Sequence, residues 1–247
     1  MISVITCSKD PTRLAAAEAS LRSALDGEEW EMVRIPDARS LAEGYNRGIA
    51  QARGDILVFS HDDVEIMAPG LGGRLRSHLS RFDVLGAAGA NRVISGAWLA
   101  AGPPYIYGQI VHLIGIGPFN VDVYGAPRRV VGGIQALDGL FMAATRSACE
   151  RIQFDEQTFD GFHLYDMDFS YAAFRAGLKL CVACDIPLLH YSPGRFDDNW
   201  RTYADRFQQK WNITPPEKMP KFQWSAAKVN TREEALDLMR PSFWGLD

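Results

Sequence analysis

Side chains that could hold a metal ion or move a proton occur in three short stretches of this 247-residue chain. In the first, His61, Asp62 and Asp63 directly follow the apolar run ILVFS at residues 56–60. Adjacent carboxylates past a buried strand can supply a ligand to Mg²⁺ or Mn²⁺ and leave coordination positions open for phosphate oxygens and water. A solvated turn also uses Asp, so this pattern alone leaves both interpretations open.

The other two stretches lie in the second half of the chain. Asp166 and Asp168 stand in FDGFHLYDMDFSYAAF, near the start of a helix predicted over 165–176. Side chains two residues apart on a helix point in different directions, so at most one faces a given pocket, and helix capping is the alternative role. One such carboxylate could act as a general base on an acceptor hydroxyl. His190, in LLHYS, could bind a metal or be a structural histidine.

The elements that must position these side chains alternate between strand and helix in the first part of the chain. Apolar runs predict strands at 2–7, 30–35, 56–60 and 84–90, and apolar residues at helical spacing predict helices near 11–25, 41–52 and 69–81. This alternation predicts an α/β fold with a mostly parallel, doubly wound sheet flanked by helices. Ligands of such sheets bind beyond the carboxyl ends of the strands. Thr6, Ser8 and the His61–Asp63 stretch lie at such ends, which favours a site over a solvated turn.

The second half predicts less regular structure. Strands are expected near 129–136, 180–184 and 188–192, and helices near 165–176 and 199–211, with a short helix opened by Thr231. Residues 93–121 contain no charged side chain, over a length that could cross a bilayer as a helix. Three prolines and five glycines within them would break such a helix repeatedly. We therefore expect an irregular apolar segment, buried or capping a pocket, rather than a membrane span.

Composition excludes several classes of function. The net charge of −4 provides no basic field for nucleic acid, so no nucleic-acid partner is expected. Four cysteines are too few for a disulfide scaffold, and the start MISVITCSKD lacks the pattern of a signal peptide. We expect a cytoplasmic protein, possibly peripheral to the membrane, in which Cys181 and Cys184 are buried rather than metal-bound. No Walker loop, GxSxG, HExxH or GxGxxG signature occurs.

Taken together, the motifs resemble those of a known enzyme family. ISVITCS followed by YNRGIAQARGDILVFSHDDV (45–64) resembles the nucleotide-sugar half of GT-A fold glycosyltransferases of the family 2 type, where N-x-G-x-x-x-A-x-G-D leads into a D-x-D motif. YDMDFSYAAFRAGLKL (165–180) resembles the acidic motif with the catalytic base, and HYSPG (190–194) the position of a metal-binding histidine. The resemblance implies one GT-A domain over 1–211, with a nucleotide-binding half at about 1–91, a smaller acceptor-side and catalytic half at about 92–211, and a C-terminal extension at 212–247.

The resemblance also implies a role for each matching residue. Asp166 matches the catalytic base, and Asp63 matches the D-x-D carboxylate that binds the metal, Mn²⁺ or Mg²⁺. His61 and His190 would complete the metal site. Thr6 and Ser8 would lie beside the nucleotide base, Asn46 on the helix that flanks the nucleotide pocket, and Asp62 near the ribose. Asp138 matches the region where the donor sugar and the acceptor meet. Asp37 is a looser match to the acidic residue that recognises the nucleotide base.

Two residues depart from the family pattern. His61 stands in place of the first Asp of D-x-D, and Tyr165 stands in place of the usual Glu of the acidic motif. Histidine still binds divalent metals and favours Mn²⁺ over Mg²⁺. Tyrosine at position 165 cannot take over the role of a glutamate carboxylate in this way. It is the best argument for the alternative that the chain is a catalytically degenerate module that binds a nucleotide sugar or a partner protein.

The function expected from this resemblance is a metal-dependent, inverting transfer of a sugar from a nucleotide diphosphate sugar to an acceptor hydroxyl. A UDP-sugar is expected more than a GDP- or dTDP-sugar, and the acceptor is expected to be a saccharide or lipid-linked. A sugar nucleotidyltransferase is a further alternative, but it normally has a glycine-rich basic loop where this chain has TCSKDPTRL. Trp98, Tyr105 and Tyr107 could stack on a sugar or belong to the core.

Overall fold

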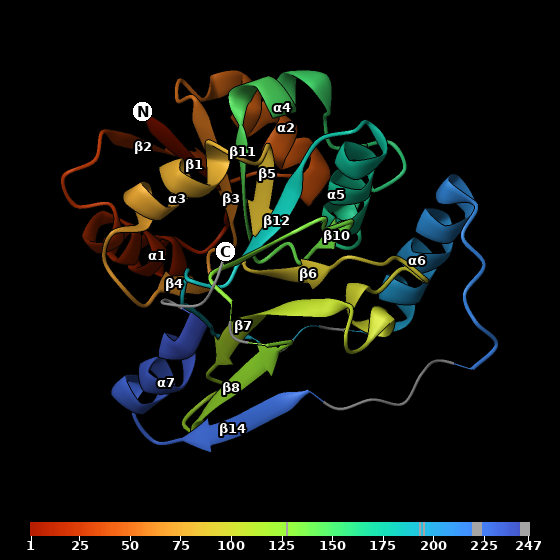
Figure 1. The fold of residues 1–247 in the computed structure, drawn as a ribbon. Coiled ribbons are helices and arrows are strands. Elements are labelled where there is room, and N and C mark those ends of the chain that lie inside the picture. Colours follow the sequence, from red (N-terminus) through yellow and green to blue (C-terminus); the bar gives the residue numbers. More distant parts are fainter. Residues whose placement is uncertain (127, 193, 195, 219–223, 243–247) are drawn as a thin grey trace.

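The computed structural model describes residues 1–126, 128–192, 194, 196–218 and 224–242. Figure 1 shows a main sheet flanked by helices, with a smaller group of strands and one helix below it. The predicted α/β fold, with a sheet flanked by helices and a smaller second subregion, is therefore confirmed, and the main sheet combines parallel and antiparallel pairs.

The main sheet has seven strands in the order β2-β1-β3-β11-β5-β12-β9. Their bounds are β1 (Ile2–Cys7), β2 (Trp30–Ile35), β3 (Ile56–Ser60), β5 (Val84–Gly86), β9 (Val130–Gly132), β11 (Phe141–Thr145) and β12 (Leu180–Ala183). β1 runs parallel to β2 and β3, and β12 runs parallel to β5, whereas β11 is antiparallel to both of its neighbours. Strands β1 and β3 are almost completely buried, as their mainly apolar sequences predict.

The second sheet has the order β10-β6-β7-β13-β4, with β8 paired to β7 and β14 paired to β8. These strands are β4 (Val64–Ile66), β6 (Ala88–Ala90), β7 (Ile106–His112), β8 (Phe119–Tyr124), β10 (Ala136–Leu137), β13 (Leu188–His190) and β14 (Ser225–Val229). β3 of the main sheet is followed directly by β4 of the second, and β5 by β6. The chain therefore changes sheets at the ends of two strands, and the two sheets meet at the carboxyl edge where a site was expected.

Three predicted elements differ from the structure. The run 84–90 is two strands in different sheets, because the chain changes sheet at Ala87. The predicted strand at 129–136 is divided into β9 and β10 around Gly133, which has a left-handed φ of 72°. Residues 93–121 are not irregular throughout: they contain the 3₁₀ turn η1 (Trp98–Ala101), all of β7 and the start of β8. β7 is buried between neighbouring strands, and Gly108 within it masks the strand pattern.

The helices begin where the sequence provides caps. They are α1 (Pro11–Ala24), α2 (Leu41–Gln51), α3 (Leu71–Leu79), α4 (Arg146–Arg151), α5 (Tyr165–Arg175), α6 (Asp198–Trp211) and α7 (Arg232–Met239), followed by the 3₁₀ turn η2 (Arg240–Ser242). The Asp10 side chain accepts hydrogen bonds from the first turn of α1, and Ser40 accepts one from the backbone N–H of Glu43 in α2. Thr231 and Glu234 form a capping box at α7.

The segment after residue 212 belongs in part to the second sheet. β14 pairs antiparallel with β8 over five residues, and α7 packs against the same strand. Met67, Val111 and Met239 are among the residues of a small second core beneath this sheet. In Figure 1, β14 and α7 lie beside β8, below the main sheet.

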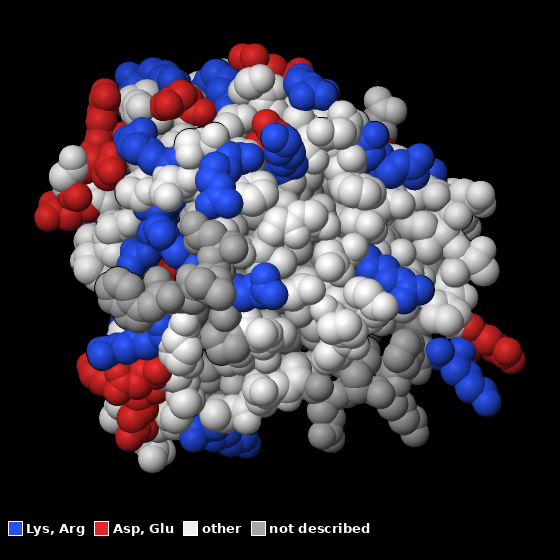
Figure 2. All heavy atoms as spheres, viewed as in Figure 1, with Lys and Arg blue, Asp and Glu red and all other residues white. Residues whose placement is uncertain are grey.

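Charges are dispersed over the surface. Figure 2 shows one face on which Lys and Arg side chains are interspersed with acidic and neutral ones. None of the helices in the described part of the chain combines the length and the apolar character needed to cross a membrane.

The packing of α2 on β1 depends on Gly48, and a methyl group there is expected to destabilise the fold. A Cβ at Gly48 would overlap the side chain of Ile5, which is completely buried. Gly48→Ala should therefore lower the free energy of unfolding by about 1–3 kcal/mol, as measured by urea unfolding.

Gly73→Ala is the matched control, because a Cβ at Gly73 on α3 meets no atom within 4 Å. This control should be neutral or stabilise by about 0.5–1 kcal/mol through the gain in helix propensity. Equal effects of the two substitutions would show that close packing at Gly48 does not limit stability.

Candidate active site

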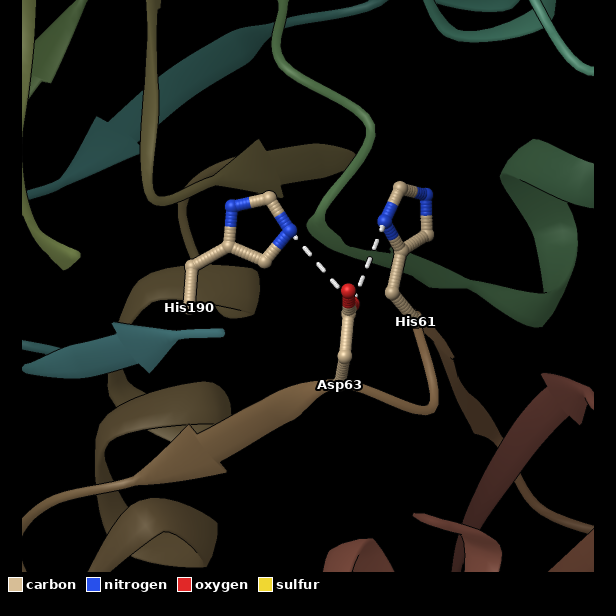
Figure 3. A group of neighbouring side chains, drawn as sticks. All are labelled: His61, Asp63 and His190. Carbon is tan, nitrogen blue, oxygen red and sulfur yellow. Dashed lines mark ion pairs between the residues drawn. The ribbon is translucent and has the colours of Figure 1, made fainter. Parts of the chain in front are cut away.

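Three side chains that could bind a divalent cation converge where β3 and β13 end. One nitrogen or oxygen atom from each of His61, Asp63 and His190 lies within 4.8 Å of the others. Asp63 Oδ1 is 3.4 Å from His190 Nε2 and 3.9 Å from His61 Nδ1, and Figure 3 shows both rings turning a nitrogen toward this carboxylate. The register of β13 against β4 pairs His190 with Val64, which brings His190 beside Asp63.

The protonation states of these groups suit a cation. Burial alone would raise the pKa of Asp63, but the hydrogen bond and charge of His190 hold it well below its ordinary value. Burial lowers the pKa of His61, and the neighbouring His190 lowers it further. An ionised carboxylate and a neutral imidazole are the forms that bind metals. The Nδ1 atom of His190 is buried and has no hydrogen-bond partner among the described residues. Two nitrogens and one carboxylate thus fit Mn²⁺ or a similar ion, with coordination positions left for phosphate oxygens.

Asp166 is a half-buried carboxylate in the first turn of α5. Its Oδ2 accepts a hydrogen bond of 2.8 Å from the backbone N–H of Gly139. Burial raises its pKa to about 7, and the negative charge of Asp138 contributes to the rise. A carboxylate with this pKa exchanges protons near neutral pH, as a general base must.

Asp168, the other acidic residue of this motif, has a different environment. Its two carboxylate oxygens accept hydrogen bonds of 2.8 Å from Lys210 and from the indole N–H of Trp211, both on α6. It therefore fastens α6 to α5. The sequence left open which of the two carboxylates faces the pocket. In the structure Asp166 lines the cavity, whereas Asp168 holds α5 and α6 together.

The turn Asp138–Leu140, between β10 and β11, connects these groups. Asp138 Oδ1 accepts from the backbone N–H of Leu140 at 3.0 Å, and Oδ2 accepts from the indole N–H of Trp98 at 2.9 Å. The carbonyl of Leu140 accepts from the backbone N–H of His61 at 3.1 Å. The backbone N–H of Leu140 and the indole N–H of Trp98 thus hold the Asp138 carboxylate in place, near enough to Asp166 for its charge to raise the pKa of Asp166.

A cavity of about 980 Å³ contains these groups. Its lining includes the carboxylates Asp63, Asp138 and Asp166 and the histidines His61 and His190. The rest of its wall is rich in aromatic side chains, namely Trp98, Tyr124, Phe162, Phe196, Trp200 and Trp224. Such a wall can pack against the apolar face of a sugar ring.

Trp224, Asp122 and His112 are among the residues of this cavity that were not predicted from the sequence. Trp224 precedes β14, and its indole N–H donates to Asp122 at 2.8 Å, while Asp122 lies 3.6 Å from His112 Nε2. The ring of His112 is 5.5 Å from that of His190. Only the pairing of β7, β8 and β14 brings these residues together, so no local sequence pattern signals them.

Among the residues predicted to contact the nucleotide, Thr6, Ser8 and Asp62 lie together at the ends of β1 and β3, whereas Asn46 and Asp37 have other partners. Ser8 and Asp62 are in contact, with the Ser8 hydroxyl donating to Asp62 Oδ2 at 2.6 Å, and Thr6 Oγ1 is buried without a hydrogen-bond partner among the described residues. The amide of Asn46 instead bonds to the backbone of Phe154, accepting from its N–H at 3.1 Å and donating to its carbonyl at 2.9 Å. Asp37 is exposed and pairs with Arg47 at 2.7 Å.

Comparisons with known proteins agree with this fold. The model of a glycosyltransferase-like family matches residues 3–214. No protein with a curated function matches the sequence significantly. The solved structures with a similar fold include the mannosyltransferase PcManGT from Pyrobaculum calidifontis in complex with GDP-Man and Mn²⁺. The two share 12% sequence identity with a TM-score of 0.53, over 98% of this chain and 69% of that one.

The family match spans the main sheet from Ser3 onward, the second sheet except β14, and all of the residues at which a role was predicted. The expected GT-A fold is confirmed by the strand order and by the structural similarity. The chain therefore belongs to the glycosyltransferase-like family and is a glycosyltransferase with the GT-A fold.

Proposed function

We propose that this enzyme is a metal-dependent, inverting glycosyltransferase that moves a sugar from a nucleoside diphosphate sugar to an acceptor hydroxyl. The observation that carries the proposal is the placement of Asp166, a half-buried carboxylate with a pKa of about 7, in the same cavity as His61, Asp63 and His190. A base and a cation site that share one cavity can serve the two ends of a single displacement.

The cation would be held by Asp63, His61 and His190. When bound, it would offset the charge that develops on the departing diphosphate. The described part of the cavity wall has few positively charged side chains that could offset this charge instead. Of the described residues that line it, Arg13 is the only Lys or Arg; its side chain is 59% exposed and lies 3.7 Å from Asp10. The two nitrogen ligands favour Mn²⁺ over Mg²⁺.

Asp166 would act as the general base. It takes the proton of the acceptor hydroxyl as that oxygen attacks the anomeric carbon, and the bond from this carbon to the diphosphate oxygen breaks on the opposite face. One displacement of this kind inverts the anomeric configuration, through an oxocarbenium-like transition state similar to that of inverting glycosidases. The Gly139 N–H, which donates to Asp166 Oδ2, orients the carboxylate for this transfer.

The donor's nucleoside would lie over the ends of β1 and β3. There Ser8 fixes Asp62, which we assign to the ribose, and Thr6 to the base. Asn46 supports this pocket through its bonds to Phe154, and Asp37 is kept as a contact to the base. The sequence favoured a UDP-sugar, whereas the structural neighbour was solved with GDP-Man, so both donors belong in the first experiment.

The acceptor would enter from the aromatic side of the cavity. Trp98 fixes Asp138 through its indole N–H, and we assign this carboxylate to the place where the donor sugar and the acceptor meet. A saccharide fits the aromatic wall, and the exposed rings of Phe162 and Phe196 at the cavity also suit the apolar part of a lipid-linked acceptor.

Donor and metal binding are tested first by thermal denaturation. The pure protein is heated with UDP-, GDP- and dTDP-sugars in the presence of Mn²⁺, Mg²⁺ or EDTA. A ligand at about 100 times its Kd stabilises the folded state by about 2.7 kcal/mol. For a chain of this size, that corresponds to a rise in Tm of about 5–10 °C. We expect one donor to produce this rise with Mn²⁺ and to lose it in EDTA.

Asp63→Asn keeps the shape of the side chain but removes its charge, so it should abolish the Mn²⁺-dependent rise. A rise that is equal in EDTA and in Mn²⁺ would contradict the proposed metal dependence. A protein that no nucleotide stabilises at millimolar concentration would contradict the proposed donor.

The second prediction concerns the role of Asp166 in catalysis. Asp166→Asn should lower kcat by about 10²–10⁴-fold while leaving donor binding unchanged, because the amide cannot accept the proton. In the wild-type enzyme, kcat/KM should rise with pH as the carboxyl group ionises around its pKa of about 7. Transfer activity that survives in Asp166→Asn would assign the base to another group.

The third prediction concerns stability and uses the same substitution. The pKa of Asp166 is about 7 in the folded protein, above its ordinary value of 3.8, so the folded state holds this proton more tightly than the unfolded state. Its contribution to stability is complete below pH 3.8 and is lost as the pH rises through 7. Asp166→Asn should therefore be more stable than wild type at pH 8, by up to about 4 kcal/mol.

Urea unfolding at pH 5, 6, 7 and 8 checks this. The advantage of the variant should grow up to about pH 7 and then level off. Asp26→Asn, at an exposed carboxylate, is the control and should show no such trend. A stability difference that is independent of pH would show that the Asp166 carboxylate is not destabilised by burial.

A further inference from the structure

The two residues that depart from the family pattern are in contact with each other. His61 Nε2 lies 2.7 Å from the hydroxyl oxygen of Tyr165, although the two positions are 104 residues apart in the chain. The same hydroxyl lies 3.2 Å from the carbonyl oxygen of Gly139. The two departures are therefore parts of one arrangement and not independent losses.

The hydrogen bonds of this hydroxyl assign the protons. A tyrosine hydroxyl has one hydrogen to donate, and a carbonyl oxygen can only accept. The Tyr165 hydroxyl must therefore donate to Gly139, and it can make its contact with His61 only by accepting a hydrogen from Nε2. A neutral imidazole carries one hydrogen on its two nitrogens, so Nδ1 then has a free lone pair. This is the nitrogen that Figure 3 shows turned toward Asp63.

We propose that Tyr165 is a positioning residue that holds His61 in the Nε2–H tautomer and so presents Nδ1 as the metal-binding atom. This inference rests on the metal site of the proposed function. An outer residue that fixes the second nitrogen of a histidine ligand typically accounts for a factor of about 10–100 in metal affinity. Tyr165 thereby takes part in metal binding through His61, while its neighbour Asp166 acts as the base.

The position of the Tyr165 ring is fixed by its surroundings. Its side chain is 4% exposed, and its ring lies 5.7 Å from that of Tyr45 in an edge-on arrangement. Gly139 leaves the space that the hydroxyl needs. A Cβ at Gly139 would lie 2.8 Å from Cζ of Tyr165 and 2.7 Å from Cβ of Asp166. The hydroxyl can therefore reach His61 and the Gly139 carbonyl together only because residue 139 has no side chain.

The chemistry of the pair explains why the two residues occur together. A glutamate at position 165 would bring a negative charge into a buried place beside Asp166, whose carboxylate is already raised in pKa by its environment. A neutral tyrosine avoids this cost and provides a hydroxyl of fixed orientation. Histidine at position 61 then supplies a nitrogen ligand, so the site has two imidazoles and one carboxylate. This ligand set selects Mn²⁺, Fe²⁺ or Co²⁺ over Mg²⁺.

The tautomer can be measured directly in the metal-free protein. In protein labelled with ¹⁵N-histidine, two-bond ¹⁵N–¹H correlations distinguish Nε2–H from Nδ1–H rings. The signals of His61 among the five histidines are assigned by their loss in His61→Asp. We expect Nε2–H for His61 in the wild type and a mixture of tautomers in Tyr165→Phe. Tyr203→Phe, which loses a hydroxyl hydrogen-bonded to Asp160 at 2.9 Å, is the control and should leave the His61 spectrum unchanged.

Mn²⁺ affinity, measured by electron paramagnetic resonance of the free ion, provides the second readout. Tyr165→Phe should weaken binding by about 10–100-fold. In a His61→Asp background the same substitution should cause no further loss, because there is no imidazole left to orient. Tyr203→Phe should bind Mn²⁺ as the wild type does.

The outcomes separate this inference from the proposed function. An Nδ1–H ring in the wild type, or an unchanged Mn²⁺ affinity in Tyr165→Phe, overturns the role of Tyr165 while leaving the metal site in place. A loss of equal size in the His61→Asp background also overturns it, since Tyr165 would then act by another route. If the wild type has the Nε2–H ring but binds no Mn²⁺, the metal dependence of the proposed function fails, and ligation through Nδ1 fails with it.

Discussion

The turn Asp138–Leu140 is the constraint on which the rest of the centre depends. It lies between β10 of the second sheet and β11 of the main sheet, and its backbone bonds to α5 and to the stretch that follows β3. The Gly139 N–H donates to Asp166, the Gly139 carbonyl accepts from Tyr165, and the Leu140 carbonyl accepts from the His61 N–H. A displacement of this turn would therefore move the proposed base and the proposed cation site together.

Electrostatics set a second constraint. The cavity brings Asp63, Asp138 and Asp166 together with almost no basic side chain among the described residues of its wall. Burial raises the pKa of Asp166, and the negative charge of Asp138 raises it further, so protonation of Asp166 removes part of this charge near neutral pH. The proposed nucleoside diphosphate would add more negative charge, for which a divalent cation would be the natural counterion. The properties that make Asp166 suitable as a base thus also make the empty site less stable at high pH.

Much of the main sheet could be predicted because its inner strands are buried on both faces. β1, β2 and β3 have the bounds that their apolar runs predicted, and the caps at Asp10 and Ser40 start their helices as expected. The change of sheet at Ala87 could not be predicted, since every residue from 84 to 90 is small or apolar and suits either sheet.

The candidate site was predictable where it follows a strand end and hidden where it depends on pairing between distant strands. Asp63 and Asp166 were identified from local motifs. The contact of His61 with Tyr165 and the place of Trp224 depend on tertiary structure, because no periodicity links residues so far apart in sequence. For Asn46, the motif predicted the helix on which the residue lies but not the partner of its side chain, because its amide bonds to the backbone of Phe154.

The pairing of β14 with β8 has a consequence for how such enzymes can diversify. The family model ends at residue 214, whereas Trp224 and β14 follow that point and still contribute to the wall of the cavity. The proposed reaction centre and part of its proposed acceptor side therefore lie in different portions of the chain. A change in the final segment can reshape what the cavity admits without altering any residue to which we assign a chemical role.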